Sequence, residues 1–141
     1  MKLITRDTDY ALRALCSIAQ SKAPVTSVSA LVQELQIPRP FLRKILQCLN
    51  KEGLLVSYKG KGGGFSLSLH PDKIYLLDLI SIFQGDLKLN ECVFKKQVCP
   101  NKARCPLSKK LALIEEQTVS VLKDVTVQSL VNENQRPEYK V

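Results

Sequence analysis

The strongest constraint on the fold of this chain is a pair of short helix patterns joined by a tight turn. Over residues 28–35, apolar side chains recur at i, i+3, i+4 and i+7 after Ser27, a candidate N-cap. Over residues 39–51, Pro40 suits a first helical turn, and Gly53 is placed to end the helix. Two helices in this order predict a helix-turn-helix motif. The predicted inward positions of the second helix are Leu42, Ile45, Leu46 and Leu49.

A glycine-rich hairpin follows these helices directly. Strand patterns flank the tip KGKGGG of residues 59–64, and the returning strand alternates through Phe65, Leu67 and Leu69. A hairpin placed after a helix-turn-helix is a wing, and this tandem order favours DNA binding. The second helix would enter the major groove, while the lysines of the tip would lie by phosphates or in the minor groove. The candidate DNA-binding residues are Arg39, Arg43, Lys44, Gln47, Lys59 and Lys61.

The charge distribution agrees with a polyanionic partner. The net charge is +8: residues 1–64 hold ten Lys+Arg against four Asp+Glu, a balance of +6, and residues 65–141 hold eleven against nine, a balance of +2. No run of about 18 apolar residues is present, so no membrane partner is expected. The start of the chain lacks a signal-peptide pattern, which predicts a cytoplasmic protein. A single histidine, His70, and the lack of a glycine loop that opens a helix predict that the protein is not an enzyme.

The remaining patterns predict a mainly α fold with a small β-hairpin wing and a long dimerisation helix. A first helix is expected over residues 8–20, with Thr8 or Asp9 as its cap, and another helix closes the domain at Gly85. From Leu107 an apolar stripe begins that is too long for a small domain to cover, so the same helix of a second subunit is expected against it. The stripe comprises Leu107, Leu111, Ile114, Val121 and Val125.

These patterns divide the chain into four segments. Residues 1–85 are predicted to form a winged helix-turn-helix DNA-binding domain, and residues 86–106 a cysteine-containing loop. Residues 107–132 are predicted to form the dimerisation helix region, in which Thr126 is a candidate cap for the last turn. The polar residues 133–141 are expected to be a flexible tail.

Three of the five cysteines lie close together in the basic loop. Cys92, Cys99 and Cys105 follow the spacing C-x6-C-x5-C, among lysines and arginines that favour the thiolate form. Three thiolates can hold zinc or an iron–sulfur cluster, and the spacing alone does not choose between these or exclude uncoordinated thiols. The other two, Cys16 and Cys48, lie on predicted helices and are expected to be small buried side chains.

The ordered set of motifs resembles the Rrf2 family of bacterial repressors. TDYALRAL near the start, RPFLRKILQCLNKEGLL, the wing KGKGGGFSL and three loop cysteines before a long helix carry this resemblance, over residues 1 to about 131. It implies a winged-helix homodimer on a palindromic operator in double-stranded DNA. It also implies that Cys92, Cys99 and Cys105 ligate an iron–sulfur cluster, which controls DNA affinity in response to redox state, nitric oxide or iron status.

Two departures from the family pattern bear on the cluster type. The first cysteine gap has six residues where the cluster-binding branches usually have five, and Ser108 stands where the IscR-type 2Fe–2S branch has a histidine ligand. The resemblance is closer to the NsrR-like 4Fe–4S branch, which implies Asp9 of the partner subunit as the fourth ligand, with Asp7 as the alternative. Asp9 also suits the helix dipole at a helix N-terminus. The family contains cluster-free regulators too, governed by thiol oxidation or a protein partner, and this alternative stays open.

Overall fold

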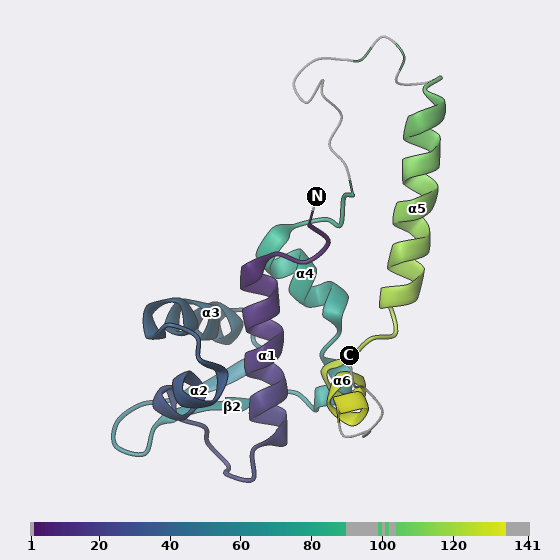
Figure 1. Cartoon of the computed structure of the whole chain (residues 1–141). Coiled ribbons are helices and arrows are strands. Elements are labelled where there is room, and N and C mark those ends of the chain that lie inside the picture. The colour runs from purple at the N-terminus through teal and green to yellow at the C-terminus, as the bar shows by residue number, and fades with distance from the viewer. Residues whose placement is uncertain (1, 90–98, 100, 102–103, 135–141) are drawn as a thin grey trace.

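The computed structural model describes residues 2–89, 99, 101 and 104–134, and its α-helices and strand β2 are labelled in Figure 1. A mainly helical fold with one antiparallel hairpin is confirmed for this part of the chain. In chain order the elements are α1 (Arg6–Gln20), α2 (Val28–Leu35), α3 (Arg39–Lys51), β1 (Leu55–Tyr58), β2 (Gly64–Leu67), the 3-10 turn η1 (Pro71–Lys73), α4 (Leu76–Gln84), α5 (Pro106–Leu122) and α6 (Val127–Asn134).

Helix α1 begins two residues earlier than predicted, because Thr5 is its N-cap. The backbone amide of Thr8 donates to Thr5 Oγ1 at 3.5 Å, which satisfies one of the free amides of the first turn. Thr8 is itself fully buried, and its hydroxyl donates to Gln84 Oε1 at 2.8 Å. The prediction that Thr8 or Asp9 caps the helix is therefore wrong, because both residues lie inside the helix.

Helices α2 and α3 form the predicted helix-turn-helix. Ser27 caps α2, because its Oγ accepts a hydrogen bond from the Ala30 amide at 3.1 Å. Gln36 ends α2 in the left-handed conformation with φ 55°, and Gly53 follows α3 with φ 81°. On α2, Leu31 is fully buried, while the other apolar residues of its stripe pack against the core at intermediate exposure. The inward positions of α3 are buried as predicted: Leu42, Ile45, Leu46 and Leu49.

The hairpin is completed by a third backbone segment. Strands β1 and β2 pair so that Tyr58 lies opposite Gly64, and Thr26 then exchanges two backbone hydrogen bonds with Phe65, with N···O distances of 2.9 and 2.8 Å. Gly64 has φ 157° and lies directly against the carbonyl of Thr26, so a side chain has no room there. The predicted alternation does not reach Leu69, which is 45% exposed because β2 ends before it.

The C-terminal half divides into an outlying helix and a packed one. Helix α4 ends at Gly85, as predicted, with φ 76°. Helix α5 extends away from the helical body in Figure 1, and none of its residues is fully buried. The chain then turns back, and α6 packs against α1 with Val127 and Val131 in the core. The core of the winged body therefore includes residues beyond the predicted boundary at 85. Within the described ranges, every helix is too short or too polar to span a bilayer.

Backbone hydrogen bonds fasten the junction of α5 and α6 to the segment before α4. The Leu76 amide donates to the Val125 carbonyl and the Val127 amide donates to the Ile74 carbonyl, both at 2.9 Å, around an isolated antiparallel bridge. These bonds satisfy polar groups that the break between the two helices would otherwise leave free. The junction is thus part of the folded body.

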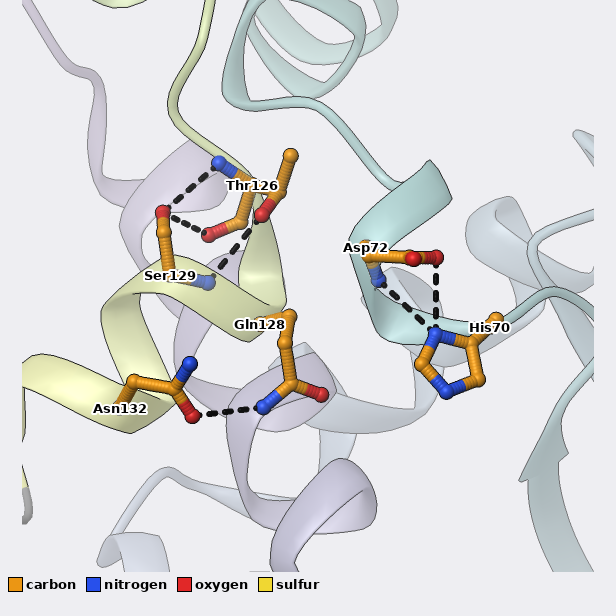
Figure 2. A network of polar contacts seen from close by, with 6 residues as sticks. All are labelled: His70, Asp72, Thr126, Gln128, Ser129 and Asn132. Atoms are coloured by element: carbon orange, nitrogen blue, oxygen red, sulfur yellow. Dashed lines mark hydrogen bonds and ion pairs between the residues drawn. The ribbon is translucent and has the colours of Figure 1, made fainter.

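Side-chain caps begin the two short elements at this junction (Figure 2). Thr126 and Ser129 cap α6 reciprocally: Thr126 Oγ1 accepts from the Ser129 amide at 3.1 Å, and Ser129 Oγ accepts from the Thr126 amide at 3.0 Å. The predicted cap at Thr126 is confirmed. His70 begins η1, and its Nδ1 lies 2.8 Å from the Asp72 carboxylate in an exposed pair.

Candidate nucleic-acid interface and cysteine loop

The exposed face of α3, the wing and the start of α2 surround a hollow of about 600 Å³. Three of the predicted DNA-binding residues line it, namely Arg43 and Gln47 from α3 and Lys59 from the wing. The other three, Arg39, Lys44 and Lys61, are exposed but lie outside its lining. The structure therefore places three of the six predicted DNA-binding residues around one hollow and leaves the other three on the surface outside it.

Sequence reasoning missed several polar residues of this hollow. Asn50 and Lys51 extend the lining along α3, at positions i+3 and i+4 from Gln47. Tyr58 contributes from β1, and its hydroxyl lies 3.5 Å from Ser66 Oγ on the neighbouring strand. Helical spacing from Gln47 was a signal that could have found Asn50. The position of Tyr58 depends on strand pairing, which the sequence pattern alone does not give.

Glycine conformations hold the wing tip in a defined turn. Gly60 and Gly62 have φ values of 86° and 76°, which side chains with a Cβ rarely adopt. The Gly63 amide donates to the Gly60 carbonyl at 3.0 Å, which closes the turn. Lys59 and Lys61 are thereby both exposed on one turn.

Two contacts link the first turn of α3 to other helices. The Arg39 guanidinium donates from Nη2 to Ser29 Oγ of α2 at 2.8 Å. The Arg6 guanidinium of α1 lies 5.3 Å from the centre of the Phe41 ring, within the range of a cation–π interaction. No side chain caps α3, whose N-cap residue is Pro38. These contacts therefore fix the part of the helix that would approach the bases.

The described part of the cysteine loop contains two of the three predicted ligands. Cys99 and Cys105 are half-buried free thiols, and Cys105 occupies the N-cap position of α5. Cys92 lies outside the described residues. Among the residues that are described, no three of histidine, cysteine and carboxylate side chains gather as a metal site.

The two cysteines outside the loop are half-buried, so the expectation of small side chains against the core holds only in part. Burial raises the pKa of the Cys16 thiol, which packs against the core from α1. Burial also raises the pKa of the Cys48 thiol, and the nearby Glu52 carboxylate adds to this, while Lys51 and Lys44 oppose it. Both thiols are therefore held in the neutral form.

The aspartates of α1 differ in their surroundings. Asp9 is half-buried, and its carboxylate forms an ion pair with Arg13 one turn later, at 2.9 Å. Asp7 is exposed. The ion pair occupies one oxygen of Asp9, which leaves the other available to a ligand.

Gln84, the last residue of α4, ties the start of α1 to the segment that leads into the cysteine loop. Its Oε1 accepts from the Thr5 amide at 3.0 Å and from the Thr8 hydroxyl, and its Nε2 donates to the Leu3 carbonyl at 3.0 Å. The loop segment is also fastened to α5, since the Leu89 amide donates to a carboxylate oxygen there at 3.0 Å.

Comparison with known proteins decides the family. The Rrf2 family model, described as an iron-dependent transcriptional regulator, matches residues 4–133. The chain belongs to the Rrf2 family. It is therefore a DNA-binding transcriptional regulator and not an enzyme.

Rrf2 relatives match nearly the whole chain. A protein of Aquifex aeolicus named as an HTH-type transcriptional regulator is 34% identical over 125 residues, which are 87% of each chain. The HTH-type transcriptional regulator NsrR of Shouchella clausii is 31% identical over 130 residues, 91% of this chain and 87% of that one.

Solved structures share the Rrf2 winged-helix fold. CymR, the global cysteine regulator of B. subtilis, has a TM-score of 0.78 at 23% identity and covers 94% of this chain and 98% of its own. IscR of T. potens has a TM-score of 0.74 at 21% identity and covers 100% of this chain and 93% of its own.

Proposed function

We propose that this Rrf2 protein is a homodimeric repressor whose operator affinity is controlled by an iron–sulfur cluster. Cys92, Cys99 and Cys105 would ligate the cluster, with Asp9 of the partner subunit as the fourth ligand, and the cluster would be of the 4Fe–4S type. The match to NsrR of Shouchella clausii at 31% identity supports this branch, and Ser108 in place of a histidine argues against the 2Fe–2S alternative. Operator binding would take place in the cytoplasm.

The observation that carries the DNA-binding part is the hollow between α3 and the wing. Arg43, Gln47 and Lys59 face one space, and α2 approaches it through its N-terminus. A recognition helix flanked by a basic wing fits a duplex, because the helix enters the major groove while the wing meets the backbone. Lys44 and Lys61, which lie outside this space, would neutralise phosphates on either side.

The dimer part rests on the uncovered face of α5. Leu107, Ile114 and Val121 recur every seven residues and are 64%, 48% and 73% exposed. The neighbouring face of α5 is turned toward its own body, where α4 contacts it and Glu115 accepts a hydrogen bond. Apolar residues at a seven-residue repeat fit a twin helix, because this spacing forms the seam of a coiled coil. A second copy of the chain is therefore the proposed occupant of this face.

The donor set fits an iron–sulfur cluster chemically. Cys99 and Cys105 are free, half-buried thiols, of which Cys105 lies at the N-terminal end of α5, and thiolates are the usual ligands of such clusters. Asp9 supplies a carboxylate oxygen, a harder ligand that holds iron less firmly than sulfur does. When bound, the cluster would supply iron that reacts with nitric oxide or oxygen. The role of Asp9 in this scheme requires one of its oxygens to remain free of Arg13.

The chain connects the proposed ligands to the recognition helix through α1. Gln84 binds the start of α1 just before the cysteine loop, and Arg6 in the same turn of α1 contacts Phe41 of α3. Helix α1 also packs along α3. A shift of the start of α1 would therefore change the position of α3, and so the fit of two recognition helices to half-sites about 34–36 Å apart.

The test compares Cys99→Ala with the wild type after purification without oxygen. The wild type is expected to be brown, to contain iron and sulfide, and to change its operator affinity on exposure to nitric oxide or oxygen. Cys99→Ala is expected to lose the visible absorbance and this response, whereas the control Cys16→Ala keeps both. A colourless wild type that still binds DNA would overturn the cluster and favour thiol oxidation or a protein partner; bound zinc without iron would also overturn it.

A further inference from the structure

Arg39, at the first position of α3, is oriented by another helix before any DNA is bound. Its guanidinium donates to Ser29 Oγ at 2.8 Å. Ser29 is free to accept this bond, because Ser27 already caps α2 through the Ala30 amide. The contact therefore belongs to the packing of the two helices of the motif and has no part in starting either helix.

The charge of Arg39 remains available although its side chain is fixed. Neither of the ion pairs found among the described residues includes Arg39, and the residue is exposed. A guanidinium has five N–H donors, so one bond to a hydroxyl leaves a pair of donors for a ligand. A side chain that is ordered before binding also loses less conformational entropy when the complex forms.

We propose that Ser29 is a positioning residue that holds Arg39 for a bidentate contact with one guanine in each half-site. Arg39 is then a specificity-determining residue of the operator contact. The N-terminal residues of a recognition helix reach base edges, and arginine bound to guanine O6 and N7 is the commonest specific contact. This assignment rests on the proposed use of α3 and the wing as the DNA interface.

The contrast with Arg43 separates the two arginines by role. Arg43 lines the hollow beside the wing, and no side-chain hydrogen bond holds it in the described part of the chain. A cation of this kind adapts to phosphates, which lie along both sides of any duplex. Arg39 is the arginine whose direction is set by the protein, so it carries the stronger sequence preference.

The experiment selects duplexes from a random pool with the full-length protein purified without oxygen, and then measures variants on the selected site. Arg39→Ala is expected to lower the preference for guanine at one position of each half-site by about tenfold. Ser29→Ala is expected to lower the same preference by about threefold, while Ser29→Thr, which keeps the hydroxyl, retains it. The dependence of log K on log salt should be unchanged in Ser29→Ala, since the substitution removes no charge.

The outcomes distinguish this inference from the interface on which it rests. If Ser29→Ala weakens binding to every duplex equally, or changes the preference at a different position from Arg39→Ala, the positioning role is wrong. An unchanged preference in Arg39→Ala also overturns it, provided that Arg43→Ala and Lys59→Ala still weaken binding. If none of these variants affects binding, the proposed interface itself fails.

Discussion

Replacing Gly64 with alanine tests the close approach between the wing and the segment before α2. Gly64 has φ 157°, and an added Cβ would meet the carbonyl of Thr26 and lie 2.9 Å from the Cα of Ser27. These are backbone atoms, so they cannot rotate away as a side chain would. The segment of Thr26 must separate from Phe65, which breaks two backbone hydrogen bonds of 2.9 and 2.8 Å.

The cost of Gly64→Ala follows from these two effects. Strain in a sparsely populated backbone region costs about 1–3 kcal/mol, and the two lost hydrogen bonds cost about 0.5–1.5 kcal/mol each. The sum is about 2–6 kcal/mol in the free energy of unfolding, a large share of the roughly 5–15 kcal/mol that a domain has. Because 1 kcal/mol corresponds to about 3–4 °C at this chain length, Tm should fall by about 6–24 °C.

Gly62→Ala is a matched control that separates backbone strain from steric overlap of the added Cβ. Gly62 also has a positive φ, 76°, but a Cβ there would meet nothing within 4 Å. Gly62→Ala should therefore cost only about 1–2 kcal/mol, the price of the left-handed conformation. Both variants would be measured by urea unfolding followed by far-UV circular dichroism. Equal midpoints for the two variants, or a smaller loss in Gly64→Ala, would refute the reasoning.

Three further predictions concern other parts of the molecule. Gln84→Leu removes the hydrogen bonds of the Gln84 side chain to Leu3, Thr5 and Thr8 and should lower the free energy of unfolding by about 1–3 kcal/mol in urea. An unchanged midpoint would contradict the role of Gln84 in joining α4 to the start of α1. Burial raises the pKa of the Cys16 thiol above its ordinary value of 9.0, so the thiol ionises in the unfolded chain before it ionises in the folded one. The contribution of Cys16 to the free energy of unfolding is therefore constant below pH 9 and falls as the pH rises further. Cys16→Ala should show a smaller loss of stability above pH 9, measured by urea unfolding. The double variant Ile114→Asp with Val121→Asp should sediment as a monomer, whereas Leu113→Asp, 51% exposed beside the proposed seam, should sediment as the wild type does.

The parts of the fold that depend on local chemistry could be predicted from the sequence. Helical spacing identified the buried face of α3, because an amphipathic stripe states directly which side meets the core. The caps at Ser27 and Thr126 were predictable for the same reason, since each hydroxyl bonds an amide three residues later. The wing followed from its glycines, whose positive φ values the tip requires.

The parts that depend on distant contacts could not be predicted in this way. The start of α1 was misplaced because Thr5, Thr8 and Asp9 are all candidate caps by residue type, and no local pattern indicates that the Thr8 hydroxyl bonds Gln84 and leaves Thr5 as the cap. The return of α6 onto α1 was missed because an apolar stripe does not say which surface covers it. At the candidate site, charge predicted Arg39 and Arg43 equally, and only the packing of α2 on α3 separates them through Ser29.

Because the junction between α5 and α6 is held on the winged body, α5 can tilt as a rigid unit about its C-terminal end. Two backbone hydrogen bonds of 2.9 Å hold its C-terminal end on the winged body. The 17 residues of α5 span about 25 Å, so a tilt of about 5° about this junction moves the end near Cys105 by about 2 Å. Conversely, a displacement of the end near Cys105 would rotate α5 about this junction and leave the backbone hydrogen bonds of the junction intact. The stiffness of this bridge, together with the contact of α4 and the hydrogen bond from Leu89 to Glu115, thus limits how much of a motion at the far end reaches the winged body.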